Sequence, residues 1–146
     1  MIEIKCKMAD DAKDLLPIKA HDDDAAFDLK SRVAAEIPPH ASALVPTGLF
    51  IELPEGFEAQ VRPRSGLALK RCVTVLNTPG TIDAGYRGEV CVILINHGND
   101  SFAISRGDRI AQMVVQELPK VKLVVAESLS DSDRGAGGFG STGTKS

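Results

Sequence analysis

At 146 residues with a formal net charge of −3, the chain has the length of one domain and lacks the basic excess that binding to DNA or RNA requires. Hydrophobic residues make up 43% and charged residues 25%, as in globular proteins, and no apolar run approaches the ~20 residues of a membrane span. We therefore expect one globular domain with neither a nucleic-acid polymer nor a membrane as partner.

The N-terminal residues alternate apolar and charged side chains and lack the layout of a signal peptide, which predicts an intracellular, cytoplasmic protein. The cysteines Cys6, Cys72 and Cys91 are widely spaced and form no C-x-x-C pair. This spacing indicates neither a disulfide framework nor a zinc site, so buried free thiols are expected.

Most of the chain consists of short runs rich in Val and Ile, in which apolar and polar residues alternate between Gly, Pro, Asn or Asp residues. This pattern is typical of β-strands with one buried face. In chain order, the predicted strands cover residues 2–7, 26–30, 43–46, 49–53, 57–62, 89–96, 109–117 and 120–125. One short helix is predicted over residues 65–71, with Ser65 as its cap. We expect an all-β fold, a jelly-roll-like β-sandwich.

The predicted strand at residues 89–96 departs from simple alternation, because residues 90–95 are all apolar. A strand that is apolar on both faces needs a cover on each of them. Either the strand is enclosed inside the monomer, or its second face lies in an interface between subunits. The pattern alone does not separate these two explanations.

From Ser128 the composition shifts to Ser, Asp, Gly and Thr, with Phe139 as the only aromatic residue. Such a segment cannot bury enough apolar surface to fold by itself. We expect a folded domain over residues 1–127 and a flexible, glycine-rich C-terminal arm over residues 128–146.

Arg62, Arg64, Ser65 and Gly66 lie where a predicted strand meets the predicted helix. Backbone amides at such a junction point outward, and with a hydroxyl and guanidinium groups beside them they form a binding site for an anion. The simpler interpretation is an exposed, capped turn.

Asp83 lies in the segment N-T-P-G-T-I-D-A-G-Y-R-G-E at residues 77–89, between the turn-forming pairs Pro79-Gly80 and Ala84-Gly85. We expect a hairpin with Asp83 near its tip. Water attack on phosphorus needs a fixed carboxylate to accept the water proton and cationic groups to neutralise the phosphate oxygens. Asp83 and the arginines suit these two roles, although an aspartate that serves only the turn is the alternative.

The run R-G-A-G-G-F-G-S-T-G at residues 134–143 is not a dinucleotide-binding motif, because no strand precedes it. It is not a Walker A motif either, because Ser141 stands where that motif requires lysine. Glycines such as Gly140 let backbone amides close around phosphates, while Arg134 can pair with an anion and Phe139 can stack on a base. A disordered tail without function is the alternative.

Taken together, five segments resemble the motifs of the homotrimeric dUTPase family, in the family's order and over nearly the whole chain. They are A-A-F-D-L-K-S at residues 25–31, R-P-R-S-G-L-A at 62–68, the segment at 77–89, G-D-R-I-A-Q-M at 107–113, and the C-terminal arm. One position departs from the family pattern, since Ala26 stands where the first motif commonly has glycine. Asp28 is nevertheless in place.

The resemblance implies a jelly-roll homotrimer that binds dUTP in active sites at the subunit boundaries and hydrolyses it to dUMP and pyrophosphate. It implies that Asp83 deprotonates the water that attacks the α-phosphorus. By the same resemblance, Tyr86 packs beneath the deoxyribose and leaves no room for a ribose 2′-hydroxyl. Asn77 pairs with the polar edge of uracil in a pocket too narrow for the thymine methyl group.

The resemblance also assigns the phosphate and metal contacts. Arg64, Ser65 and Gln112 are similar to the family's phosphate ligands, with Gly66 beside them. Asp28 is similar to the acid that holds water on Mg²⁺, the expected cofactor, which bridges the triphosphate oxygens. A neighbouring subunit's arm closes the site, with its arginine on the γ-phosphate and its aromatic ring over uracil.

Two other functions remain to be weighed against this one. A dCTP deaminase of the same fold places a catalytic glutamate on the strand after the hairpin, where residues 90–95 contain no carboxylate. A module that binds nucleotide without catalysis has no need of Asp83, Gln112 and an intact arm. The absence of a carboxylate at residues 90–95 and the presence of Asp83, Gln112 and the arm both favour a dUTP pyrophosphatase.

Overall fold

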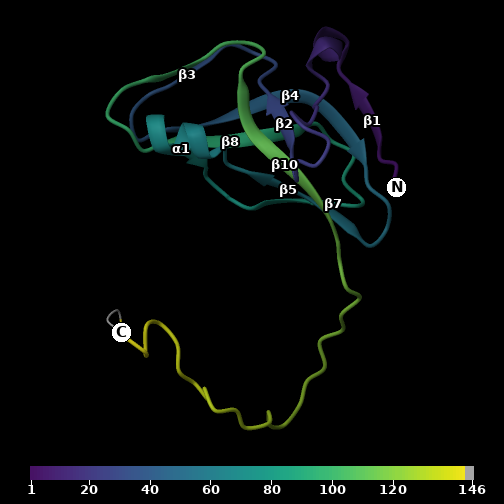
Figure 1. The fold of residues 1–146 in the computed structure, drawn as a ribbon, viewed down its shortest axis with the longest axis vertical. Coiled ribbons are helices and arrows are strands. Elements are labelled where there is room, and N and C mark those ends of the chain that lie inside the picture. The colour runs from purple at the N-terminus through teal and green to yellow at the C-terminus, as the bar shows by residue number, and fades with distance from the viewer. Residues whose placement is uncertain (144–146) are drawn as a thin grey trace.

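The computed structural model describes residues 1–143, which form a β-sandwich followed by an extended C-terminal segment (Figure 1). Within these residues, the strands pair into two antiparallel four-stranded sheets and one two-stranded sheet. The predicted all-β, jelly-roll-like class is confirmed. Over the same residues, no helix combines the length and the apolar character that a membrane crossing needs.

The first sheet has the strand order β1-β4-β8-β6. Its strands are β1 (Lys5–Met8), β4 (Ser42–Glu52), β8 (Val90–Asn96) and β6 (Val73–Val75). The second sheet has the order β2-β10-β5-β7. Its strands are β2 (Phe27–Lys30), β10 (Arg109–Glu117), β5 (Phe57–Arg62) and β7 (Gly80–Asp83). The small sheet pairs β3 (Ala35–Ile37) with β9 (Phe102–Ile104).

Apolar side chains from both four-stranded sheets join one buried core. Val45 and Val92 contribute from the first sheet, and Leu29 and Ala59 from the second, each at most 1% exposed. Burial of apolar surface stabilises the fold by roughly 25 cal/mol per Å². The core therefore fixes the faces that the two sheets present to solvent.

Several predicted strands are confirmed, two of them with their bounds. The predictions at residues 57–62 and 109–117 coincide with β5 and β10. Residues 43–46 and 49–53 belong to one strand, β4, because the chain continues through a bulge where the pairing register shifts between Pro46 and Leu49. The first strand begins at Lys5 instead of residue 2.

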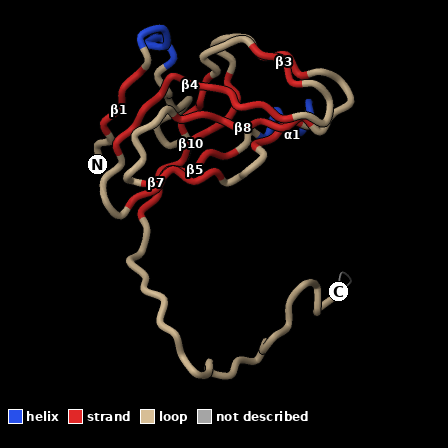
Figure 2. The backbone as a smooth tube through the Cα atoms, turned by 180° about the vertical axis from the view of Figure 1, so that it is seen from behind, coloured by secondary structure: helices blue, strands red, loops and turns tan. Residues whose placement is uncertain are grey.

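The predicted strand at residues 120–125 is wrong. In the described chain no strand follows Glu117, and residues 120–125 are extended and exposed. Val121, Leu123 and Val125 are at least 82% exposed, so the alternation that suggested a strand belongs to a segment without a partner strand in this chain. Figure 2 shows this segment leaving the sandwich and leading to the C-terminal end.

The predicted helix at residues 65–71 is confirmed as α1 (Ser65–Arg71), but Ser65 is not its cap. Arg64 occupies the N-cap position, and no side chain bonds to the free amides there. A second helical element, the 3-10 helix η1 (Asp10–Leu15), was not predicted. It buries Ala12 and Leu15 against the sandwich.

Residues 77–89 do not form a hairpin, so that expectation is wrong. Their central part is β7, which pairs with β5 of the second sheet, while β6 and β8 on either side belong to the first sheet. The chain thus crosses from one sheet to the other and back. Asp83 ends β7 and begins the turn that leads toward β8.

The strand β8 is enclosed on one face only. Val92 and Leu94 are fully buried, whereas Cys91, Ile93 and Ile95 on the other face are half-buried. Enclosure inside the monomer is therefore the wrong explanation for this doubly apolar strand. An interface between subunits stays a prediction.

The expectation of buried thiols is wrong for Cys6 and Cys72, which are exposed. Both lie at edges of the fold, Cys6 on the edge strand β1 and Cys72 directly after α1. Cys91 is half-buried, and its burial raises the pKa of its thiol.

Candidate active site

One cleft of the described surface, called the Asp28 cleft below, lies over the second sheet beside the start of α1. It has a volume of about 340 Å³. Its lining residues are Ala20, Asp24, Ala25, Ala26, Asp28, Arg62, Arg64, Ser65, Gly66, Gln112 and Val114. This cleft brings together the residues predicted to bind phosphate and the residue predicted to act on the metal.

Strand register explains why Asp28, Arg62 and Gln112 meet. Gln112 on β10 lies opposite Asp28 on β2 and also opposite Arg62 on β5. Residues directly opposite each other in an antiparallel sheet share a face. Three strands that are distant in sequence thus place three polar side chains in one row.

The charges around Asp28 favour an anionic ligand. The carboxylate is only 19% exposed, with Nε of Arg64 3.4 Å from one oxygen and Nη1 of Arg109 3.1 Å from the other. Arg64 also donates a hydrogen bond to the carbonyl of Arg109 at 2.9 Å. Two guanidinium groups share one carboxylate, so positive charge remains for further oxygens.

The start of α1 completes this cleft. Ser65 and Gly66 are exposed at its rim. The side-chain amide of Gln112 donates to the carbonyl of Pro63 at 3.0 Å, which ties β10 to the segment that leads into α1. Ser65 and Arg64, which line the same cleft, thus follow a segment that is held to the second sheet.

A second cleft, called the Asp83 cleft below, lies along β7 and the start of β8 and has a volume of about 330 Å³. Its lining residues are Leu44, Val61, Asn77, Gly80, Thr81, Ile82, Asp83, Tyr86, Glu89, Val90, Cys91 and Ile93. It brings together the residues predicted to contact the base and the sugar and to activate water.

The turn after β7 is closed by its own hydrogen bonds. The amide of Tyr86 donates to the carbonyl of Asp83 at 3.0 Å. The guanidinium group of Arg87 donates to the carbonyls of Ala84 and Tyr86 at 2.6 and 2.9 Å. The Asp83 side chain remains exposed. A carboxylate is therefore presented to solvent from a backbone that is held in place.

Glycines make room for the two other predicted side chains of this cleft. A Cβ atom on Gly88 would lie 2.4 Å from the hydroxyl oxygen of Tyr86, and one on Gly80 would lie 3.2 Å from Nδ2 of Asn77. The Tyr86 hydroxyl donates to the carbonyl of Glu89 at 2.9 Å. The phenol ring therefore folds back over Gly88.

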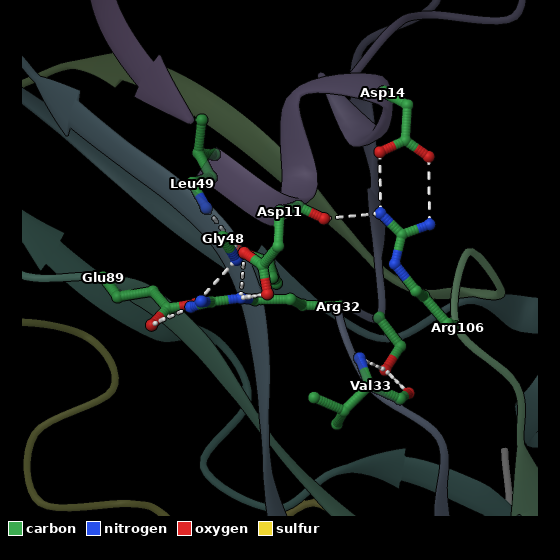
Figure 3. A network of polar contacts seen from close by, with 10 residues as sticks. Asp11, Asp14, Arg32, Val33, Gly48, Leu49, Glu89 and Arg106 are labelled. Atoms are coloured by element: carbon green, nitrogen blue, oxygen red, sulfur yellow. Dashed lines mark hydrogen bonds and ion pairs between the residues drawn. The ribbon is translucent and has the colours of Figure 1, made fainter. Parts of the chain in front are cut away.

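A polar network joins the end of this segment to the bulge of β4 and to η1 (Figure 3). The Glu89 carboxylate accepts a hydrogen bond from the amide of Gly48 at 2.7 Å and lies 3.4 Å from Nη1 of Arg32. Arg32 also pairs with Asp11 of η1 at 2.8 Å. The hydrogen bond from Arg32 holds the pKa of Asp11 below its ordinary value.

The predicted site residues of a single chain lie in three separate places. The two clefts share no lining residue. The third place is the C-terminal arm, where Arg134 bonds to the carbonyl of Gly137 at 2.7 Å and Phe139 and Gly140 are exposed. Figure 1 shows this arm away from the sandwich.

Sequence reasoning missed four residues that shape the clefts, namely Arg32, Gly88, Glu89 and Arg109. Only Gly88 carried a usable signal, since a glycine two residues after an aromatic side chain permits close packing over the backbone. The ion pairs of the other three join residues far apart in sequence.

The Asp28 cleft provides few ligands for a metal ion. It contains the carboxylates of Asp24 and Asp28, and Asp24 already accepts a hydrogen bond from the amide of His21 at 2.9 Å. Across residues 1–143, no three His, Cys, Asp or Glu side chains gather as a metal site. This set fits a cation that keeps its waters and takes phosphate oxygens, as Mg²⁺ does.

Comparisons with known proteins find relatives that match nearly the whole chain. A deoxyuridine 5′-triphosphate nucleotidohydrolase of Gloeothece citriformis is 58% identical over 132 residues, which cover 90% of this chain and 91% of that protein. One of Clostridium acetobutylicum is 56% identical over 145 residues, 99% of each chain. Among solved structures, the dUTPase of Staphylococcus bacteriophage 80alpha with dUPNHPP aligns with a TM-score of 0.89 at 26% identity, over 99% of this chain and 100% of that one.

A family model also matches almost the whole sequence. The model described as dUTPase covers residues 13–143, which include both clefts and the described part of the arm. This match and the close relatives confirm the resemblance that the five motifs predicted. The chain belongs to the dUTPase family.

Proposed function

We propose that the protein hydrolyses dUTP to dUMP and pyrophosphate, with Asp83 as the base that activates water. Water attacks the α-phosphorus, the new O–P bond forms as the bond to the bridging oxygen breaks, and pyrophosphate leaves. Asp83 takes the proton of the water. The observation that carries this role is an exposed carboxylate on a turn fixed by backbone hydrogen bonds at the edge of a cleft.

Selection of the nucleoside is assigned to the Asp83 cleft. We assign the polar edge of uracil to Asn77 and the face of the deoxyribose to the Tyr86 ring. A ring that is bonded at its hydroxyl and packed over Gly88 forms a wall with which a 2′-hydroxyl would collide. Steric exclusion of this kind discriminates more strongly than a weak attraction can.

The phosphates are assigned to the Asp28 cleft. Arg64 supplies positive charge, while Ser65, Gly66 and Gln112 supply hydrogen bonds to the phosphate oxygens. Two guanidinium groups face the single carboxylate of Asp28, so positive charge is left to attract phosphate oxygens. This excess of positive charge supports the assignment. A triphosphate carries enough negative charge to occupy such a cleft.

Magnesium is assigned to the same cleft, where Asp28 would hold it through a bound water molecule. When bound, Mg²⁺ neutralises the charge on the triphosphate oxygens. Asp28 is held in its orientation by its two arginine partners.

The complete site requires more than one subunit, and we propose a homotrimer. Each chain presents the two clefts apart, and a dUTP molecule must contact residues of both. The half-buried face of β8 supplies apolar surface for the contact between subunits. The arm of a neighbour would bring Arg134 to the γ-phosphate, Gly140 to the phosphates and Phe139 over uracil. Because dUTP is a nucleotide of the cell interior, the proposal also places the enzyme in the cytoplasm.

The experiment that tests this function compares four nucleotides with purified protein and Mg²⁺. Pyrophosphate release from dUTP should exceed release from dCTP, dTTP and UTP by at least about 10²-fold in kcat/KM. Equal turnover of UTP would remove the role given to Tyr86. Ammonia release from dCTP would favour a deaminase instead.

A further inference from the structure

Glu89 follows directly on the turn that carries Asp83 and Tyr86, yet the proposed reaction gives it no part. Its carboxylate is 21% exposed and is bonded at 2.7 Å to the amide of Gly48 on β4. Both carboxylate oxygens also lie 3.4 Å from Nη1 of Arg32. Charge-assisted bonds of this kind are strong where solvent is partly excluded. Glu89 is therefore held by elements outside its own turn.

The bulge in β4 is shaped to provide this anchor. Gly48 has a φ of 76°, and a Cβ atom there would lie 2.4 Å from that of Ala12, so only glycine fits. Next to it, the hydroxyl of Thr47 donates to the carbonyl of Val90 at 2.5 Å. Two consecutive bulge residues thus bond to two consecutive residues at the start of β8.

The main chain of Glu89 in turn holds the phenol ring. The Tyr86 hydroxyl donates to the Glu89 carbonyl at 2.9 Å, and both residues line the Asp83 cleft. The Tyr86 hydroxyl makes no hydrogen bond to β7 or β5, both of which are fully described. Its position therefore depends on where the Glu89 backbone lies, and that depends on Gly48 and Arg32.

We propose that Glu89, held by Gly48 and Arg32, is a positioning residue that fixes the Tyr86 ring and so sets the selectivity for deoxyribose over ribose. The inference rests on the role proposed for Tyr86. A steric wall discriminates only while it stays in place, and a displacement of about 1 Å is enough to lose much of that discrimination.

The test uses the fact that Tyr86 is the only tyrosine in a chain without tryptophan. Its fluorescence and its quenching by acrylamide report on this ring alone, in full-length protein without nucleotide. In Glu89→Ala we expect altered emission, stronger quenching, and a fall of about tenfold in the ratio of kcat/KM for dUTP over UTP. Glu89→Gln keeps the acceptor for Gly48 and should show the same changes to a smaller degree.

The matched control is Arg106→Gln. It breaks the pair of Arg106 with Asp14 and its hydrogen bond to the carbonyl of Asp11, so it loosens η1 while the bonds of Glu89 to Gly48 and Arg32 stay in place. The control should leave both the Tyr86 emission and the nucleotide ratio unchanged. If Glu89→Ala does not fold, Glu89→Gln carries the test alone.

The outcomes separate this inference from the proposed function. Unchanged emission in a folded Glu89 variant overturns the positioning role. Altered emission with an unchanged nucleotide ratio overturns the link to selectivity if Tyr86→Ala lowers that ratio. If Tyr86→Ala also leaves the ratio unchanged, the role proposed for Tyr86 has failed, while the contact between Glu89 and the ring stands.

Discussion

The Asp28 cleft and the Asp83 cleft are built in different ways. The Asp28 cleft comes from strand register, which aligns Asp28, Arg62 and Gln112 on one face and surrounds a carboxylate with guanidinium groups. The Asp83 cleft comes from a turn, from glycines that leave room for Asn77 and Tyr86, and from an anchor on another strand. We therefore propose that the Asp28 cleft recognises charge and the Asp83 cleft recognises shape.

This difference predicts two kinds of kinetic effect. All nucleoside triphosphates carry the same phosphates, so a change in the Asp28 cleft should affect dUTP and UTP equally. A change in the Asp83 cleft that moves the sugar wall should alter their ratio.

The largest effect is expected for Asp83→Asn. The amide cannot accept the proton of the attacking water, so kcat should fall by about 10³-fold. Its size and position are nearly unchanged, so the Kd of a non-hydrolysable dUTP analogue should stay within a few-fold of the unmodified protein. Single-turnover kinetics and calorimetry measure the two quantities. A rate close to that of the unmodified protein would remove Asp83 as the base.

Removal of the arm after Ser132 tests a segment that belongs to neither cleft. The described arm is exposed and separate from the core, so the truncated protein should remain folded and keep its oligomeric state. We expect kcat/KM to fall by about 10²-fold for dUTP, because Arg134 and Phe139 no longer close the site. Circular dichroism and light scattering provide the control. Unfolding of the truncated protein would show that the arm is structural.

Arg64→Ala tests the charge of the Asp28 cleft. Asp28 keeps its partner Arg109, so the fold should persist, while a phosphate contact is lost. We expect kcat/KM to fall by about 10²-fold for both dUTP and UTP, with their ratio unchanged. A selective effect on one nucleotide would contradict the separation of charge and shape. Lys70→Ala, which removes an exposed positive charge from the last turn of α1 and lines neither cleft, is the matched control and should leave both values unchanged.

The sequence predicted the fold correctly where burial of one strand face imposes a regular alternation of apolar and polar residues. β5 alternates strictly and was predicted with its bounds, because its apolar side chains are the ones the core needs. The short strands β3, β6 and β9 were missed, since three residues are too few to show a period. Residues 120–125 alternate as well, but a strand also needs a partner, and that partner is not encoded in the local pattern.

The sequence predicted the chemical types of the site residues but not their grouping. Motifs gave Asp28, Asp83 and Tyr86, whereas the division of these residues between two clefts depends on how the strands pack. The bond between Glu89 and Gly48 joins residues 41 positions apart and leaves no local trace. Contacts of this kind follow from the packing of the two sheets.

Gly88→Ala tests the shape of the Asp83 cleft. The new methyl group would overlap the Tyr86 hydroxyl, and the side chain can rotate away without disturbing the core. We expect the ratio of kcat/KM for dUTP over UTP to fall by about tenfold, with little change in melting temperature. Gly85→Ala, where an added Cβ meets nothing within 4 Å, is the matched control. An unchanged ratio in Gly88→Ala would mean that the ring does not form the sugar wall.

The smallest effect is expected for Arg106→Gln. This change leaves both clefts intact and should slightly lower the melting temperature, by an amount that depends on pH. The hydrogen bonds from Arg106 hold the pKa of Asp14 below its ordinary value of 3.8. A carboxyl group with a lowered pKa stabilises the folded state above its unfolded pKa, and this contribution is lost as the pH falls through the folded value. The variant should therefore melt slightly below the unmodified protein at neutral pH, and the difference should shrink once the pH falls below 3.8. Thermal melts from pH 7 downward measure it. Because the pair of Arg106 and Asp14 is exposed, added salt should also reduce the difference in melting temperature. A difference in melting temperature that grows toward low pH would contradict the assigned ion pair.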